Sequence, residues 1–477
     1  MNLWIGGIVD DQKSASGAER AVQTAYAEFW PGPILDDENP PSNCNEYDRL
    51  YRIVYNDDII GQLHPSNAVL TWPTHLGAKY ENVNKVDEYQ PRDGDRPLVF
   101  GDEMLWWLMN DRGNSHLNTR GRPVGVEVRT MAYAFGVPGT VGNTTFYRYE
   151  IKNRNSVPID SMFVGWKIDG IDDRASDPDN YMGTDTTLSL MYIYNSDADD
   201  IAYGSQPPAI GVFVLENELK RSSGAGYERR VLAPEFTSTI PIYPQIGTAV
   251  RSADDMYTWL NGQWPILRHL STLPYDMREG GDGGYLHPVD GPSVSFMYPG
   301  DPINGSFWSM MNTDGNGHQA RREYPVMLGS VGPVSLQPND IHVVTIAIVW
   351  AQGQNNWDSV RKLRDEVAYI RSIAPILTSP RSIPKSTPTE PSLSLSLGIF
   401  PNPFRSSTSV SFSIPTSADI EISVFDVLGR QVGSVADGFF EVGTYTRSFD
   451  ASELTPGVYY MRFSIIGKSF ARSIVVM

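Results

Sequence analysis

Nine aspartates lie between Asp169 and Asp200, the densest group of possible metal ligands in the chain. Carboxylates this close together repel one another unless a cation neutralises them, and Ca²⁺ prefers about six to eight oxygen ligands. The spacing lacks the Asp-x-Asp-x-Asp-Gly frame of an EF-hand, so a solvated acidic loop is the alternative. The predicted calcium ligands are Asp169, Asp172, Asp173, Asp177, Asp179 and Asp185.

Glu127 and Glu150 suggest a different chemistry, because each falls in the middle of a predicted strand. Two carboxylates about 5–9 Å apart can hydrolyse a glycosidic bond, one as acid and one as base or nucleophile. Charged side chains on the solvent face of a sheet produce the same pattern. A secreted, carbohydrate-active hydrolase and an ordinary polar sheet face both remain open.

Four tryptophans could form a carbohydrate-stacking surface, since aromatic faces pack on sugar rings. They are Trp106, Trp107, Trp166 and Trp264. The alternative is that they fill the core of a β-sandwich. His116 follows Asp111 in a polar segment, but no Gly-x-Ser-x-Gly or His-Glu-x-x-His motif accompanies it. We therefore interpret His116 as a loop histidine.

The elements that would position these residues are mostly strands. Segments 124–135, 145–153 and 161–169 predict three consecutive antiparallel strands, which favour a sandwich sheet. A further strand at 341–350 precedes one amphipathic helix, for which Asp358 is the predicted cap and Pro375 the stop. The apolar face of this helix is predicted at Val360, Leu363, Val367 and Ile370.

Composition narrows the class of protein. A chain of 477 residues with 42 Gly, 35 Pro and 11% aromatic residues favours a β-rich, turn-rich protein of two or more domains. No apolar run approaches the ~20 residues of a membrane span. The net charge of −18 argues against nucleic acid or anionic lipid as a partner and favours divalent cations. Cys44 is the only cysteine, so no internal disulfide can form.

The C-terminal residues read as a separate small β unit. Segments 409–414 and 420–425 alternate apolar and polar residues with the period of a half-buried strand. Asp437-Gly438 and Pro456-Gly457 predict turns, and about seven short strands fit a compact immunoglobulin-like sandwich. The same stretch contains "PNPF", "VFDVLGRQV", "LTPGVYYMRF" and a short apolar tail, in that order.

These four motifs closely resemble the C-terminal (type A) sorting domain of type IX secretion cargo in Bacteroidota-type bacteria; a generic immunoglobulin-like module is the alternative. The resemblance implies that residues 393–477 engage the type IX machinery and direct the protein to the outer-membrane surface or the extracellular space. The chain begins Met1-Asn2-Leu3-Trp4, without a basic region or a small-residue cleavage site. We therefore expect a native signal peptide to precede this sequence.

The remaining residues also show a resemblance. "GDEMLWWLMND", "NTTFYRYEIKNR" and "GPVSLQPNDIHVVTIAIVWAQGQ" look like parts of a secreted β-sandwich family found among uncharacterised type IX cargo. This resemblance implies an architecture and transfers no activity.

Together these observations predict a mainly β protein. Its parts are a large antiparallel β-sandwich body at 1–377, of one lobe or two, a Pro/Ser/Thr-rich linker at 378–392, and an immunoglobulin-like sandwich at 393–477. We expect the body to serve in structure, adhesion or binding of a cell-surface or carbohydrate ligand, and the rival is the secreted hydrolase. No catalytic residue is assigned, and calcium is the one predicted cofactor.

Overall fold

A computed structural model divides the chain into two compact units, residues 1–382, here called the body, and residues 383–477, here called the C-terminal unit. The structure describes residues 2–16, 28–35, 47–59, 64–83, 85–117, 119–168, 179–223, 226–242, 252–262, 295–313, 315–320, 326–381, 396–400, 402–414, 418–427, 429–441, 443–465 and 468–477.

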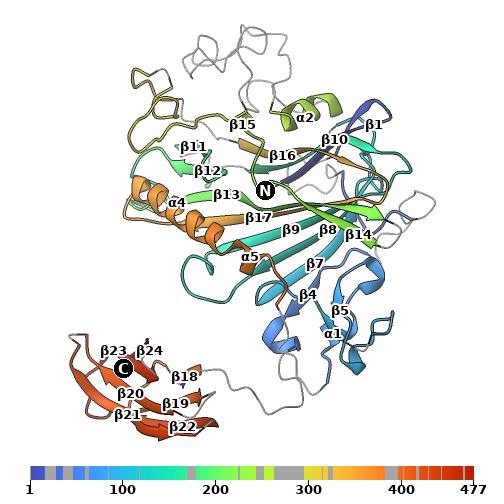
Figure 1. Cartoon of the computed structure of the whole chain (residues 1–477). Helices are drawn as coiled ribbons and strands as arrows, with labels where there is room; N and C mark the ends of the chain where they lie inside the picture. The colour runs from blue at the N-terminus through green and yellow to red at the C-terminus, as the bar shows by residue number, and fades with distance from the viewer. Residues whose placement is uncertain are drawn as a thin grey trace. The chain divides into compact units, whose positions relative to one another are not determined.

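Two antiparallel sheets build the described part of the body (Figure 1). The smaller sheet has the order β15 (Ser238–Ile242), β16 (Val326–Leu336), β10 (Ile159–Ile168), β1 (Asn2–Val9), β2 (Gln12–Ser16). The larger sheet has the order β11 (Asn180–Asp185), β12 (Leu190–Asn195), β13 (Ala209–Ser223), β17 (Ile341–Ala351), β9 (Thr144–Asn153), β8 (Val126–Ala134), β7 (Glu103–Asn110), β3 (Trp30–Pro31). Two more strands join it, β14 (Gly226–Val231) beside β13 and β4 (Tyr51–Val54) beside β7, while β5 (Tyr80–Glu81) and β6 (Arg96–Pro97) form a separate pair. The predicted mainly β fold class is confirmed.

The two sheets pack face to face through alternate residues of their strands. The ring of Tyr149 on β9 lies 5.9 Å from the ring of Trp166 on β10. A side chain at Gly329 on β16 would come within 2.7 Å of the Met191 sulfur on β12, so glycine allows the sheets to approach there. Because side chains alternate along a strand, Arg148 and Glu150 point away from this core, to the outer face of the larger sheet.

Helix α4 (Asn356–Ser372) covers part of this outer face and packs along β12, β13 and β17 (Figure 1). All four predicted apolar positions are buried: Val360, Leu363, Val367 and Ile370. The predicted cap is wrong by three residues, because the Asn355 side chain accepts the hydrogen bond from the Asp358 N–H at 2.9 Å. The Asp358 carboxylate instead accepts from the Gln354 N–H.

Pro375 does not mark the end of helical structure. Helix α4 stops at Ser372, and Pro375 lies in the first turn of a second short helix, α5 (Ala374–Leu377). Proline is tolerated there, because a first-turn N–H has no intrahelical acceptor. Helix α2 (Ala253–Leu260) was not predicted, and the Ser252 side chain caps it by accepting from the Asp255 N–H.

Short helical turns lie beside β4 and β7. They are α1 (Asn67–Leu70), the π-helical turn η2 (Tyr55–Ile59), and the 3₁₀ turns η3 (Thr74–Leu76) and η4 (Pro91–Asp93).

The start of the predicted linker binds to the body. The Arg381 N–H donates to the Val99 carbonyl at 2.7 Å, and the Arg381 guanidinium forms an ion pair with Asp102. Just before it, the Tyr133 hydroxyl donates to the Leu377 carbonyl at 3.1 Å. The start of the predicted linker is thus fixed to the body through Arg381, and the rest of it, 382–392, lies outside the described residues.

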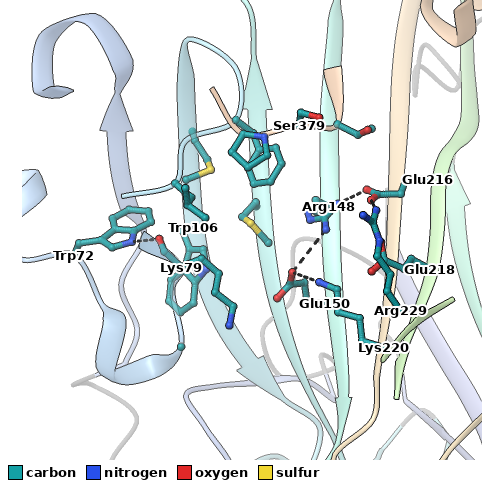
Figure 2. Close-up of a pocket in the computed structure, with 17 residues that line it drawn as sticks. Trp72, Lys79, Trp106, Arg148, Glu150, Glu216, Glu218, Lys220, Arg229 and Ser379 are labelled. Atoms are coloured by element: carbon teal, nitrogen blue, oxygen red, sulfur yellow. Dashed lines mark hydrogen bonds and ion pairs between the residues drawn. The ribbon is translucent and has the colours of Figure 1, made fainter. Parts of the chain in front are cut away.

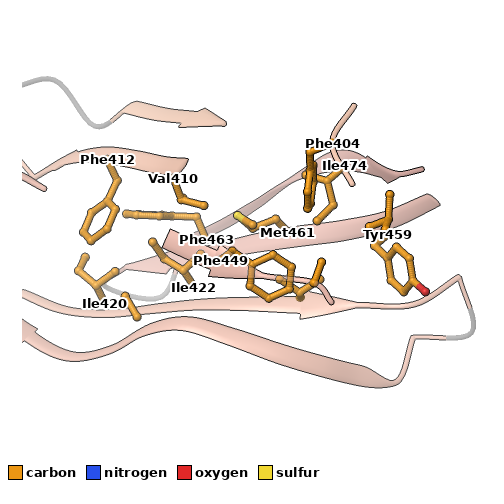
Figure 3. Close-up of a cluster of buried hydrophobic side chains, with 14 of the residues drawn as sticks. Phe404, Val410, Phe412, Ile420, Ile422, Phe449, Tyr459, Met461, Phe463 and Ile474 are labelled. Atoms are coloured by element: carbon orange, nitrogen blue, oxygen red, sulfur yellow. The ribbon is translucent and has the colours of Figure 1, made fainter. Parts of the chain in front are cut away.

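In the C-terminal unit the described strands form two sheets. One has the order β18 (Ser396–Phe400), β19 (Ser407–Ile414), β22 (Gly443–Asp450), and the other β21 (Gln431–Phe440), β20 (Ala418–Phe425), β23 (Gly457–Ile465), β24 (Lys468–Val476). A cluster of buried apolar side chains lies between them (Figure 3). Phe412 of β19 meets Phe463 of β23 with ring centroids 6.1 Å apart.

One predicted turn of this unit is wrong. Asp437-Gly438 lies within β21. The chain reverses earlier, where the Asp426 carboxylate accepts from the Arg430 N–H at 2.9 Å. Among the described residues of the whole chain, no helix is long and apolar enough to cross a membrane.

Candidate functional site: a pocket on the outer face of the larger sheet

The predicted calcium ligands fall mostly outside the described residues, namely Asp169, Asp172, Asp173 and Asp177. Asp179 and Asp185 flank the two ends of β11, about 20 Å apart at ~3.3 Å per residue, so one ion cannot bind both. Asp179 accepts a hydrogen bond from Asn195, and Asp185 forms an ion pair with Arg364. In the part of the chain that the structure describes, no group of three or more His, Cys, Asp or Glu side chains could hold a metal ion.

Glu127 and Glu150 lie on the outer face on adjacent strands, and both are buried, which corrects the expectation of a solvent-exposed face. Glu127 is used structurally: its carboxylate accepts from the Ile34 N–H at 2.7 Å and lies 3.4 Å from the Arg154 guanidinium. Arg129 is the cross-strand partner of Glu150 and lies 4.0 Å from Glu127. The two carboxylates therefore do not face a shared empty space.

The tryptophans do not form one stacking surface. Trp166 is fully buried between the sheets, Trp106 lines a pocket on the outer face, and Trp107 points to the opposite face and lines a different cavity. Trp264 lies outside the described residues.

His116 is a structural loop residue. Its Nε2 lies 2.7 Å from the Asp111 carbonyl oxygen. The Asp111 carboxylate in turn accepts from the N–H groups of Val124 and Val126 at 2.6 and 2.8 Å. This pair closes the loop between β7 and β8.

The pocket on the outer face encloses about 310 Å³ (Figure 2). Its floor comes from adjacent strands of the larger sheet, and its rim from segments 72–79, 98–100 and 378–380. One row of cross-strand neighbours crosses the floor: Trp106 (β7), Met131 (β8), Arg148 (β9), Thr345 (β17) and Glu216 (β13). The next row contains Glu150 (β9), Val343 (β17) and Glu218 (β13).

A β-bulge on β13 determines which of its side chains reach the pocket. Phe213 pairs with Ala347 and faces the outer side, where the Arg371 guanidinium lies over its ring. The register shifts between Val214 and Glu216. An extra residue reverses the alternation of a strand, so odd-numbered residues point outward before the bulge and Glu216, Glu218 and Lys220 point outward after it.

The two sides of the pocket differ in polarity (Figure 2). One side is apolar and comprises Trp72, Leu98, Phe100, Met104, Trp106 and Met131. The ring centroids of Trp72 and Trp106 are 6.4 Å apart, and the Trp72 indole N–H donates to the Lys79 carbonyl at 3.1 Å. The other side carries the charged groups, namely Arg148, Glu150, Glu216, Glu218, Lys220 and Arg229.

The charged side chains are joined in ion pairs. Arg148 forms an ion pair with Glu216 and lies 3.8 Å from Glu150. The Lys220 ammonium is 3.4 Å from Glu150. The hydroxyl of Thr345 donates to Glu216 at 2.7 Å. Burial alone would raise the pKa of Glu150, but Lys220, Arg148 and further cations outweigh it and hold that pKa below its ordinary value.

Two of the three carboxylates lie deeper than their cationic partners. Glu150 and Glu218 are buried, with exposed side-chain fractions of 7% and 2%, whereas Glu216 is 14% exposed and its partner Arg148 is 9% exposed. The cationic partners of Glu150 and Glu218 reach toward solvent, with 24% for Lys220 and 65% for Arg229, whose Nε lies 2.6 Å from Glu218. The carboxylates therefore hold the cations in place, and an incoming molecule meets mainly cations on this side.

The sequence patterns indicated two of the pocket residues, Glu150 and Trp106, and none of the others. A signal was present in "ENELK", where Glu216, Glu218 and Lys220 place a charge at every second position after an apolar run. Charges with the period of a strand indicate one polar face. Only the order of the strands in the sheet brings these three residues close to Arg148.

Comparison with known proteins identifies one of the two units. Residues 398–477 match the family model described as "Secretion system C-terminal sorting domain". The match supports the secretion-system sorting domain that the motifs of this part of the chain predicted. The match supports export of the protein by type IX secretion to the cell surface or the extracellular space.

The comparisons leave the body unassigned. No curated protein matches the chain. Among solved structures, a β-glucuronidase of Faecalibacterium prausnitzii aligns at 9% identity and TM-score 0.15, covering 68% of this chain and 47% of its own. Dimeric latent PorU of Porphyromonas gingivalis aligns at 10% identity and TM-score 0.15, covering 79% of this chain and 31% of its own. Similarity at this level supports no inference about fold or function.

Proposed function

We propose that the body is an extracellular binding protein whose ligand site is the outer-face pocket, carried out of the cell by the C-terminal sorting domain. The observation that carries this proposal is the pocket's division into an apolar side and a side of cations fixed by buried carboxylates. Ligand sites are typically concave, about 300–1,000 Å³ in volume, and mostly apolar with a few fixed polar groups.

The geometry favours binding over hydrolysis. A glycoside hydrolase needs one carboxylic acid with a raised pKa and a second carboxylate directed at the same bond. Here Glu150 is held as a carboxylate by its cations, and Glu216 and Glu218 form ion pairs with Arg148 and Arg229. The three carboxylates are thus engaged with the protein's own cations, and the hydrolase has less support.

A substitution at the rim tests the proposal. Ser379 is exposed, and its hydroxyl donates to the Pro375 carbonyl at 2.7 Å. Ser379→Trp would fill the pocket mouth and leave the buried sides intact. Ser372→Trp is the matched control, because Ser372 is exposed on α4, makes a similar bond to Tyr369, and does not line the pocket.

The measurement is a thermal-shift screen of the full chain against monosaccharides, oligosaccharides and small organic acids, followed by calorimetry of each hit. A ligand that binds only the native state raises the melting temperature. We expect a hit that stabilises the unmodified protein and Ser372→Trp, but not Ser379→Trp. Hits that bind all three equally, a screen without hits, or turnover of chromogenic glycosides would each contradict the proposal.

A further inference from the structure

Resting on the proposed function, we infer the chemical class of the ligand: a small organic carboxylate that carries an apolar ring face. The carboxylate would bind Lys79, Lys220 and Arg229, and the ring face would pack against the side formed by Trp72, Phe100 and Trp106. Acidic sugars and aromatic carboxylic acids both belong to this class.

The arrangement of charge in depth is the first argument. Glu150 and Glu218 are almost fully buried, whereas their partners Lys220 and Arg229 are 24% and 65% exposed. A ligand entering from solvent therefore meets ammonium and guanidinium N–H donors before it meets a carboxylate. Hydrogen bonds in which both groups are charged are shorter and about twice as strong as neutral ones.

The local charge balance is the second argument. The lining contains four cations, Lys79, Arg148, Lys220 and Arg229, against three carboxylates, Glu150, Glu216 and Glu218, an excess of 4 − 3 = +1. The whole chain carries −18. Because salt screens charges beyond about 8 Å at physiological ionic strength, the local excess governs binding, and the pocket can attract an anion that most of the surface repels.

Lys79 is the pocket cation for which the described residues provide no ion-pair partner. Its side chain is exposed and lines the pocket, and within the described residues no carboxylate forms an ion pair with it. Lys79 and Lys220 both line the pocket, and the charge of each lowers the pKa of Glu150. An ammonium without a partner at the pocket wall can bind an incoming carboxylate without first breaking an ion pair.

The apolar side of the pocket determines what the part of the ligand beyond its carboxylate must be. Trp72 and Trp106 present aromatic surface opposite Lys220 and Arg229 (Figure 2). Lys79 lies on the aromatic side of the pocket, beside Trp106. A simple ion such as phosphate would leave this surface in contact with water, so it would gain little from the apolar side. A ring with one apolar face and a carboxylate at its edge satisfies both sides within about 310 Å³.

Calorimetry of the full chain with matched probes tests this class. The pairs are galacturonate with galactose, and 4-hydroxyphenylacetate with its amide, and inorganic phosphate is measured alone. We expect at least one carboxylate to bind about tenfold or more tightly than its uncharged counterpart, and to bind more weakly as salt is added. The two pairs distinguish an acidic sugar from an aromatic acid.

Lys79→Met removes the ammonium from an exposed side chain and should weaken carboxylate binding about tenfold while leaving uncharged probes unchanged. Lys85→Met is the control, because Lys85 is exposed and makes the same change in net charge outside the pocket. Equal effects of the two substitutions, equal binding of charged and uncharged probes, or binding of neither pair would overturn the inference. The proposed function would still stand if another ligand from the wider screen were blocked by Ser379→Trp.

Discussion

The body and the C-terminal unit bury different kinds of side chain. Among the described residues, the buried side chains of the C-terminal unit are apolar apart from Thr408 and Ser423. The body buries many ionisable groups, including Arg148, Glu150 and Glu218. Burying a charge is unfavourable unless it is paired, so such groups indicate a special site more strongly than apolar packing does. The body is therefore where we place the proposed ligand site, and the C-terminal unit matches a secretion sorting domain over residues 398–477.

The largest expected effect concerns export. Deleting residues 393–477 from the full-length gene should leave the protein in the periplasm, because residues 398–477 match a secretion sorting domain. The measurement is the fraction of protein accessible at the cell surface or in the medium. Ser379→Trp is the control and should be exported normally, since it changes only the pocket. Normal surface display of the truncated protein would contradict the prediction.

The next prediction compares an arginine in each unit. Arg148→Met removes the cation between Glu216 and Glu150 and should destabilise the body by about 3–5 kcal/mol, because Glu216 loses its closest cation and Glu150 keeps only Lys220. Arg462→Met breaks a pair with Glu421 whose side chains are 44% and 45% exposed, and should cost under about 1 kcal/mol.

Denaturant unfolding of the full chain measures both effects. Each substitution is expected to move only the transition of its own unit, provided that the two units unfold separately. Similar decreases in unfolding free energy for Arg148→Met and Arg462→Met would show that the buried charges of the pocket contribute no more to stability than a surface ion pair does.

The two units also differ in how much of their structure the sequence could predict. In the C-terminal unit, motifs contiguous in the chain identified the domain, and period-two alternation located β19 and β20. In the body, β8, β9, β10, β17 and α4 were predicted close to their observed bounds. Local patterns suffice where an element's own residues decide its structure.

The pocket could not be predicted in this way. Apart from Lys79, its charged side chains come from β9, β13 and β14. Their proximity depends on the order of the strands in the sheet, which period-two alternation within one strand does not encode. The bulge between Val214 and Glu216 adds a second obstacle, because it reverses the face on which later residues lie. The predicted cap at Asp358 failed for a smaller reason: Asn355, three residues earlier, is an equally good N-cap residue.

A third prediction uses a histidine buried in the body. His342 is fully buried, with Nε2 2.8 Å from the Asn217 side-chain oxygen. Burial lowers its pKa from 6.5 to about 4. The folded state thus favours the neutral ring, so stability is full above about pH 6.5 and falls as the pH drops toward 4. Between pH 6.5 and pH 4 the unfolding free energy should fall by about 3 kcal/mol through His342 alone.

His342→Gln should flatten this part of the pH profile of the body's unfolding free energy. His75→Gln is the control, because His75 is exposed and its substitution should leave the profile unchanged. As the pH falls below about 4.5, Glu150 adds a further loss of stability, because its pKa is lower in the folded state and the unfolded chain takes up the proton first. A profile that is the same in both variants would contradict the assignment to His342.

The smallest expected effect concerns calcium, which we propose binds within the acidic run of the body. Asp179 and Asp185 cannot share an ion, so a site would use Asp169, Asp172, Asp173 and Asp177 with at most one of these two. Binding to the native state alone stabilises by about 2.7 kcal/mol at a hundredfold excess over the dissociation constant. Because the shift in melting temperature per kcal/mol falls with domain size, we expect a rise of only a degree or more. The C-terminal unit has no such run, and its transition should not move.

The measurement compares melts in chelator and in millimolar calcium. Asp172→Asn with Asp177→Asn should abolish the calcium-dependent rise. The control pair Asp419→Asn with Asp437→Asn makes the same change in charge at exposed strand positions of the C-terminal unit and should preserve it. If the calcium-dependent rise in melting temperature persists in the Asp172→Asn, Asp177→Asn variant, or is lost equally in both double variants, a general charge effect would explain it. Identical melts of the unmodified protein in both buffers would leave the acidic run as a solvated loop.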